Sequence, residues 1–80
     1  MNLIFVTGPA CQPCEQMKPV IEQLESEGNV TIERLNVVDD LDKIAELGVR
    51  STPTLVLDSN YLVGYNDLST VKGWIEGSSN

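Results

Sequence analysis

The succession of elements near the N-terminus constrains the fold of this chain more than any other feature. Leu3-Ile4-Phe5-Val6 is an unbroken apolar run, which is typical of a buried strand with parallel neighbours. Gly8-Pro9 interrupts the run. The next apolar residues have the spacing of one helical face, and they are Met17, Val20, Ile21 and Leu24. A strand that leads into an amphipathic helix predicts the first half of a β-α-β unit.

Residues 30–37 predict the second strand of that unit. Asp39-Asp40 then offers an N-terminal cap to a short helix, and Gly48 ends it. The apolar residues that this helix carries are Leu41, Ile44, Ala45 and Leu47.

Two short apolar runs and a last helix complete the chain. Residues 54–57 and 61–63 are separated by three polar turn residues, so they predict a hairpin. Asn66 or Asp67 would cap the last helix, whose expected inward residues are Leu68, Val71, Trp74 and Ile75. The order β-α-β-α-β-β-α predicts an α/β fold with a mixed four-stranded sheet and helices on both faces. We expect residues 1–80 to form a single domain.

Charge and hydropathy argue against nucleic-acid binding and against a membrane span. The net charge is −7, and the five basic residues are scattered singly, so no basic stripe could neutralise nucleic-acid phosphates. No segment approaches the ~20 apolar residues of a membrane span, and the N-terminus lacks a signal-peptide pattern. We therefore expect a cytoplasmic protein that binds neither nucleic acid nor membrane. We also expect it to be a monomer.

The pair Cys11 and Cys14 carries the most specific chemical signal. It stands where the first loop becomes the first helix, and a helix N-terminus stabilises a thiolate through its free N–H groups and dipole. The i, i+3 spacing brings both sulfurs to one side of the first turn, and Pro13 is well tolerated there. Cys11 is thus predicted to be the nucleophile and Cys14 the resolving thiol of disulfide exchange. A structural zinc site would need about four ligands, and the chain has two cysteines and no histidine, so no metal is expected. Two inert buried cysteines are the remaining alternative.

Several motifs resemble the thioredoxin superfamily. The tetrad Cys11-Gln12-Pro13-Cys14 is similar to the thioredoxin Cys-Gly-Pro-Cys, and Pro19 stands five residues after Cys14 as the helix proline does there. Gly48–Leu55 resembles the segment that carries a cis-proline, and Gly64–Leu68 resembles the glycine loop before the last helix. The resemblance implies a thioredoxin fold and reduction of protein disulfides, with no bound cofactor.

The resemblance also implies a set of substrate-binding residues. It implies a cis bond before Pro53, with the Thr52 backbone pairing with bound substrate as a short strand. The remaining residues expected to support substrate binding are Gln12, Pro13 and Gly64.

The chain also departs from thioredoxins. Ala10 replaces the tryptophan before the first cysteine, Phe5 replaces a buried aspartate, and Arg34 takes the place of its lysine partner. The short length is similar to that of glutaredoxins, and Asn66 or Asp67 could bind glutathione there. Thioredoxin reductase and glutathione thus both stay open as electron donors. A thioredoxin-like binding module with a redox-silent cysteine pair is a further alternative.

Overall fold

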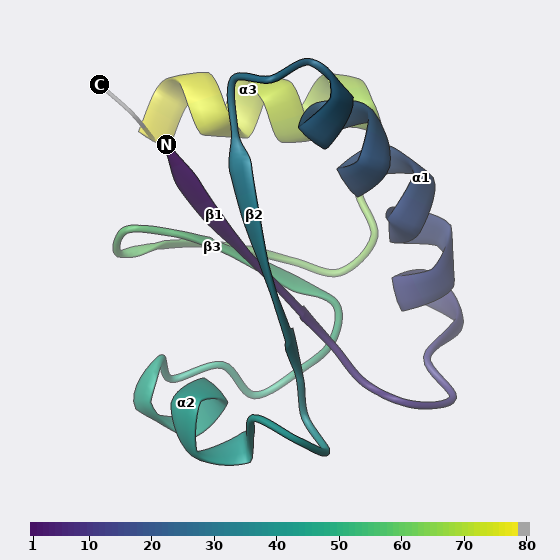
Figure 1. The fold of residues 1–80 in the computed structure, drawn as a ribbon, viewed down its shortest axis with the longest axis vertical. Helices are drawn as coiled ribbons and strands as arrows, with labels where there is room; N and C mark the ends of the chain where they lie inside the picture. The colour runs from purple at the N-terminus through teal and green to yellow at the C-terminus, as the bar shows by residue number, and fades with distance from the viewer. Residues whose placement is uncertain (79–80) are drawn as a thin grey trace.

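A four-stranded sheet forms the centre of the protein in a computed structural model that describes residues 1–78 (Figure 1). The elements in chain order are β1 (Asn2–Thr7), α1 (Gln12–Ser26), β2 (Thr31–Asn36), α2 (Leu41–Glu46), β3 (Thr54–Leu57), β4 (Asn60–Val63) and α3 (Leu68–Ser78). The order of elements agrees with the sequence prediction. β1 extends one residue beyond the predicted run at each end, β2 is one residue shorter than predicted at each end, and β4 begins one residue earlier. No helix among the described residues is both long and apolar enough to cross a membrane.

The sheet is mixed, with the strand order β2-β1-β3-β4. β1 pairs with β2 in parallel, and Leu3 lies opposite Ile32. β3 runs antiparallel to both of its neighbours, with Leu55 opposite Phe5 on one side and Leu62 on the other. This arrangement places β1 and β3 in the interior of the sheet. All four residues of β3 are buried, which explains why its sequence is apolar except for Thr54.

Two apolar layers fill the two faces of the sheet. α1 and α3 cover one face, where the buried residues include Leu3, Phe5, Met17 and Val71. α2 lies on the other face, where Ile44 packs with buried residues of β1 and β2 (Figure 1). The prediction of helices on both faces is confirmed. The alternation of side chains along β1 explains how one strand supplies both layers.

The prediction that an aspartate side chain caps α2 is wrong. Asp40 is the N-cap residue, but its carboxylate makes no hydrogen bond to the helix. Its Oδ2 instead accepts a hydrogen bond of 3.0 Å from the backbone N–H of Asn36, at the end of β2. Of the apolar residues that the sequence assigned to this helix, Leu41 is 61% exposed. Ile44 is the one described residue of α2 that is buried. A helix of six residues has room for little more than one inward position.

The cap of α3 is the predicted one, with Asp67 as the capping residue. Its Oδ1 accepts a hydrogen bond of 2.9 Å from the backbone N–H of Thr70. The bonds from Thr70 lower the pKa of the Asp67 carboxyl. A lowered pKa in the folded state means that the charged carboxylate contributes stability above the ordinary carboxyl range, and that this contribution is lost as the pH falls through the lowered value.

Asp67→Ala is therefore expected to lower the melting temperature at pH 7 by about 5 °C, because α3 loses its cap. The deficit should shrink below about pH 4, where the native cap is itself increasingly protonated. Thermal unfolding followed by circular dichroism at about pH 7 and about pH 3 would measure both effects. Asp39→Ala removes an exposed carboxylate that makes no capping bond and is the control. An equal deficit for the two variants would contradict this role of Asp67.

Candidate active site

Cys11 and Cys14 form a disulfide at the N-terminus of α1. Cys11 is the N-cap residue, and its Sγ accepts a hydrogen bond of 3.2 Å from the backbone N–H of Cys14. The two Cα atoms are 5.2 Å apart, within the ordinary range for a disulfide. Pro13 lies in the first turn, where its missing N–H costs no helical bond. The predicted placement of the pair at a helix start is confirmed.

The two sulfurs differ in their access to solvent. Cys11 is partly exposed, whereas Cys14 is 2% exposed and belongs to the buried face of α1. Ala10 has a φ of +52°, so the chain turns sharply between the end of β1 and Cys11. An incoming disulfide could therefore reach Cys11 from solvent, while Cys14 is reached only from Cys11.

The peptide bond between Thr52 and Pro53 is cis, as the sequence motif predicts. Pro53 is buried, and the Thr52 hydroxyl donates a hydrogen bond of 3.6 Å to the Sγ of Cys11. Gly8 also lies close to this peptide, because a Cβ at Gly8 would come within 3.0 Å of a Val37 methyl and 3.6 Å of the Thr52 hydroxyl. The residues that follow β1 and β2 thus lie close to the loop before β3. The family resemblance implied a role only for the backbone of Thr52, and no local pattern signals the contact that its side chain makes.

The loop between β4 and α3 contacts the segment that holds the cis peptide. The backbone N–H of Gly64 donates a hydrogen bond of 2.8 Å to the Pro53 carbonyl, and Gly64 has a φ of +85°, which favours glycine. The N–H of Asn66 donates to the Sδ of Met17 on α1 at 3.3 Å. Met17 is fully buried, so this loop is tied to both the cis-proline segment and the cysteine-bearing helix.

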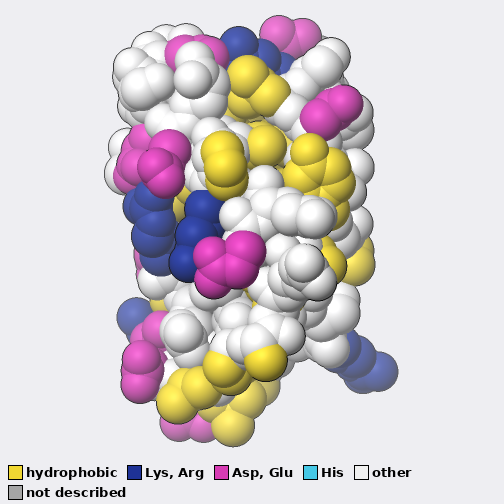
Figure 2. All heavy atoms as spheres, turned by 90° about the vertical axis from the view of Figure 1, so that its right-hand side faces the viewer, with side chains coloured by type: hydrophobic (Ala, Val, Ile, Leu, Met, Phe, Trp, Pro, Cys, Tyr) yellow, Lys and Arg dark blue, Asp and Glu magenta, His cyan; other side chains and the backbone are white. Residues whose placement is uncertain are grey.

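Exposed apolar and polar residues surround Cys11. Pro9, Ala10, Gln12 and Pro13 are all exposed. Figure 2, which views the molecule from the α1 side, shows hydrophobic side chains gathered at its lower end, the end at which Figure 1 places both the loop between β1 and α1 and the helix α2. Apolar surface that the fold itself does not bury is typical of a surface that contacts other proteins.

Comparisons with known proteins agree with this geometry. The model of a thioredoxin domain family matches residues 2–76. The chain belongs to the thioredoxin family. A thioredoxin from Haemophilus influenzae is 44% identical over 60 residues, which cover 72% of this chain and 56% of that protein. A thioredoxin from Rickettsia conorii is 28% identical over 75 residues, covering 85% of this chain and 71% of that protein.

A solved thioredoxin structure extends the comparison to three dimensions. A point mutant of a thioredoxin from Halobacterium salinarum NRC-1 superposes with a TM-score of 0.84 at 27% identity. The match covers 95% of this chain and 72% of that one. The thioredoxin fold predicted from the sequence is therefore confirmed. The chain spans little more than half the length of the Haemophilus thioredoxin that it matches.

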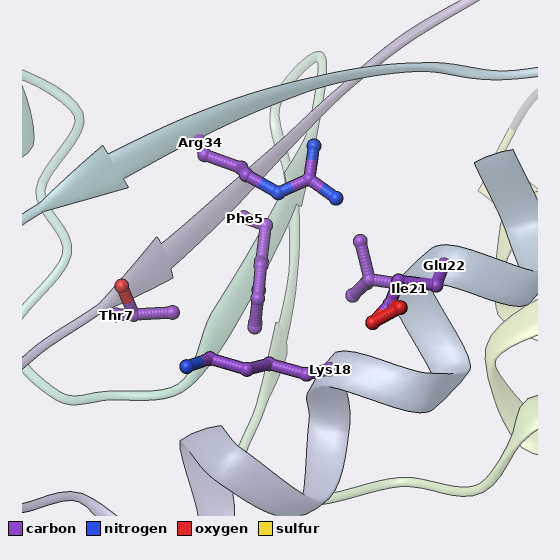
Figure 3. A pocket seen from close by; sticks show the side chains of 6 residues that line it. All are labelled: Phe5, Thr7, Lys18, Ile21, Glu22 and Arg34. Carbon is purple, nitrogen blue, oxygen red and sulfur yellow. The ribbon is translucent and has the colours of Figure 1, made fainter.

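Phe5 marks the clearest departure from the thioredoxin pattern. It is 2% exposed and forms the floor of a hollow of about 170 Å³ between α1 and the sheet (Figure 3). Figure 3 shows the Phe5 ring between the side chains of Lys18 and Arg34. Among residues 1–78, the one buried polar side chain is that of Thr54. No buried carboxylate in this part of the chain can therefore take a proton from Cys14.

The two cations beside Phe5 form ion pairs with carboxylates on α1. Arg34 binds Glu25 through two hydrogen bonds of 2.8 Å, and these bonds lower the pKa of Glu25. Lys18 Nζ lies 3.0 Å from the carboxylate of Glu15. The sequence comparison predicts Arg34 in place of the lysine that partners the buried aspartate in thioredoxins. The structure places it instead in an ion pair at the surface.

Asn66 and Asp67, the two residues considered for glutathione, have partners within the chain. The Asn66 amide donates to the carbonyls of Val63 and Gly64 at 3.5 and 3.2 Å, and Asp67 caps α3. Their hydrogen bonds thus hold the loop and the helix start. Across residues 1–78, no three His, Cys, Asp or Glu side chains come together as metal ligands would.

Proposed function

We propose that this protein is a dithiol–disulfide oxidoreductase that reduces disulfides in other proteins. The observation that carries the proposal is the Cys11–Cys14 disulfide at the start of α1, with one sulfur partly exposed and the other buried. Membership of the thioredoxin family supports the same chemistry. The cysteine pair itself accepts and releases the electrons, so the cycle needs no bound cofactor or metal.

The proposed reaction has two exchange steps. In the reduced protein, the Cys11 thiolate attacks one sulfur of the substrate disulfide, and the other substrate sulfur leaves as a thiolate. Cys14 then attacks the Cys11 sulfur, closes the internal disulfide and releases the second substrate thiol. The substrate gains two electrons and two protons, and the protein loses them. In the absence of a buried carboxylate among residues 1–78, the proton of Cys14 passes to the departing substrate thiolate or to water.

The loops around Cys11 would hold the substrate during this reaction. An extended substrate segment would pair with the backbone of Thr52 as a short added strand. The loop at Gly64 supports that peptide through its bond to the Pro53 carbonyl. Gln12 and Pro13 are exposed beside Cys11 and would contact the substrate around its disulfide.

The proposed electron donor is a thioredoxin reductase, in a reducing compartment such as the cytoplasm, with the protein acting as a monomer. Glutathione is the less favoured donor, because Asn66 and Asp67 already have hydrogen-bond partners in the chain. Following NADPH oxidation with thioredoxin reductase, or with glutathione and glutathione reductase, would separate the two donors. Consumption through the glutathione system alone would contradict the proposed donor.

Reduction of insulin in the presence of dithiothreitol tests the function itself. The wild-type protein is expected to accelerate precipitation of the insulin B chain above the rate with dithiothreitol alone. Protein whose reduced Cys11 has been alkylated with iodoacetamide is the control, because the exposed attacking thiol is then blocked while Cys14 stays buried. Equal precipitation with and without the protein would contradict the proposal and favour a redox-silent binding module.

Removal of the Thr52 hydroxyl is expected to slow the first exchange step. Its hydrogen bond to Cys11 Sγ would stabilise the attacking thiolate more than the neutral thiol, so its loss lowers the fraction of thiolate near neutral pH. For Thr52→Val, the second-order rate constant for alkylation of reduced Cys11 at about pH 7 should fall about two- to tenfold. Thr31→Val, on the distant end of β2, is the control and should leave the rate unchanged. A normal rate in Thr52→Val would show that the hydroxyl has no such role.

A further inference from the structure

A second hollow lies beside the cis peptide and is separate from the cysteine pair. It measures about 290 Å³ and lies between the loop after α2 and the edge strand β4. The residues that line it include Val49, Arg50, Ser51, Thr54, Tyr61 and Val63. Ser51 directly precedes Thr52, whose hydroxyl contacts Cys11, so the lining of the hollow is next in the chain to the residue that contacts the reactive sulfur. We call it the Arg50 groove.

A side-chain hydrogen bond and strand pairing hold the walls of the Arg50 groove in place. The Tyr61 hydroxyl donates a hydrogen bond of 2.5 Å to the carbonyl of Leu47 at the end of α2. Thr54 lies opposite Val63 in the ladder between β3 and β4. Tyr61 is nevertheless 47% exposed and Val63 is 61% exposed. The fold therefore fixes these apolar side chains without burying them, which leaves them available to a bound segment.

Arg50 gives the groove its charge. Three of the five basic residues, Lys18, Arg34 and Lys72, form ion pairs of 2.8 to 3.0 Å with glutamates. Arg50 is exposed, and no carboxylate among residues 1–78 lies within ion-pair distance of it. The chain has twelve acidic residues and a net charge of −7, so the groove carries a positive side chain on a protein whose net charge is negative. Such a cation is complementary to an acidic group supplied by a partner.

We propose that the Arg50 groove binds the substrate segment next to the reactive cysteine and favours an acidic side chain in it. This inference rests on the proposed function and extends it to substrate preference. A segment that pairs antiparallel with the Thr52 backbone would run past Arg50 in the C-terminal direction of the substrate. Arg50 precedes Thr52 by two residues, or about 7 Å of extended chain. The preferred acidic residue is therefore two or three positions after the substrate cysteine, and apolar neighbours would contact Tyr61 and Val63.

Single-turnover kinetics with model peptides test this preference. Each peptide carries one cysteine in a mixed disulfide with thionitrobenzoate. The release of thionitrobenzoate is followed by absorbance after the peptide is mixed with the reduced protein. One peptide has glutamates two and three positions after the cysteine, a second has glutamines there, and a third has the glutamates before the cysteine. The variants are Arg50→Gln and Arg50→Glu. Lys43→Gln is the matched control, because it removes an equally unpaired cation that lies on α2 outside the groove.

Wild-type protein is expected to react about two- to fivefold faster with the first peptide than with the glutamine peptide. Arg50→Gln should abolish that ratio, Arg50→Glu should invert it, and Lys43→Gln should preserve it. A ratio unchanged in Arg50→Gln, or an equal preference for glutamates before the cysteine, would overturn the inference. Failure of every peptide to react with the wild-type protein would contradict the proposed function, and with it this inference. Reaction of all three peptides at one rate would contradict the substrate preference of the Arg50 groove but not the proposed function.

Discussion

Cys11→Ser is expected to reduce insulin reduction by at least about 100-fold, to the rate of dithiothreitol alone. The hydroxyl of serine is not ionised near neutral pH, so the helix N-terminus has no anion to stabilise and the first exchange cannot start. Cys14 is 2% exposed and cannot take over the attack on an external disulfide. Turbidity measured for wild type and variant at equal concentration would give the ratio.

Cys14→Ser is the informative companion variant, because it leaves Cys11 in place and removes only the second step. In single-turnover experiments it should react with one equivalent of substrate disulfide and then stop. Its multiple-turnover rate should therefore fall, while its first exchange stays within about threefold of wild type, because only the resolving thiol is lost. Substantial turnover by Cys11→Ser, or the loss of the first exchange in Cys14→Ser, would reverse the roles assigned to the two cysteines.

Phe5→Ala is expected to have the largest effect on stability, about 3–5 kcal/mol of the free energy of unfolding. Phe5 is 2% exposed and packs in the core between the sheet and the helices α1 and α3, so its loss leaves a cavity. Because a chain of this length has a stability of about 4–12 kcal/mol in all, the variant should be close to its unfolding midpoint at moderate temperature. Urea denaturation of the oxidised proteins would measure the difference.

Tyr65→Ala provides the matched control for that experiment. Tyr65 is also aromatic but is 47% exposed and belongs to neither core layer. Its removal should change the free energy of unfolding by about 0.5 kcal/mol or less. Similar losses for Phe5→Ala and Tyr65→Ala would contradict the described packing around Phe5.

Much of the fold could be predicted because the relevant signals are local. The apolar run in β1, the helical spacing of Met17 and Ile21 in α1, and the glycine after each of the first two helices are all readable within a few residues. The cysteine pair could be placed at a helix start for the same reason. The cis bond before Pro53 came from the resemblance to thioredoxins, since most bonds before proline are trans.

The features that sequence reasoning missed depend on contacts between distant segments. Thr52 reaches Cys11 across 41 residues, and the Met17 sulfur receives the N–H of Asn66 across 49 residues. No local pattern signals either bond. The Asp40 carboxylate looked like a helix cap, but the Asn36 N–H at the end of β2 is within its reach and binds it instead. In each case the three-dimensional neighbour decides which of several possible bonds forms.

Mapping the covalent adduct of Cys14→Ser tests the central claim most directly. The reduced variant is mixed with a peptide that contains one disulfide, quenched in acid, digested and examined by mass spectrometry. The proposed mechanism predicts a peptide joined by a disulfide to Cys11, formed within the time of a wild-type turnover and released by dithiothreitol. The same treatment of Cys11→Ser should yield little or no adduct on Cys14 in that time. Absence of the Cys11 adduct, or equally fast adduct formation on Cys14, would contradict the proposed mechanism.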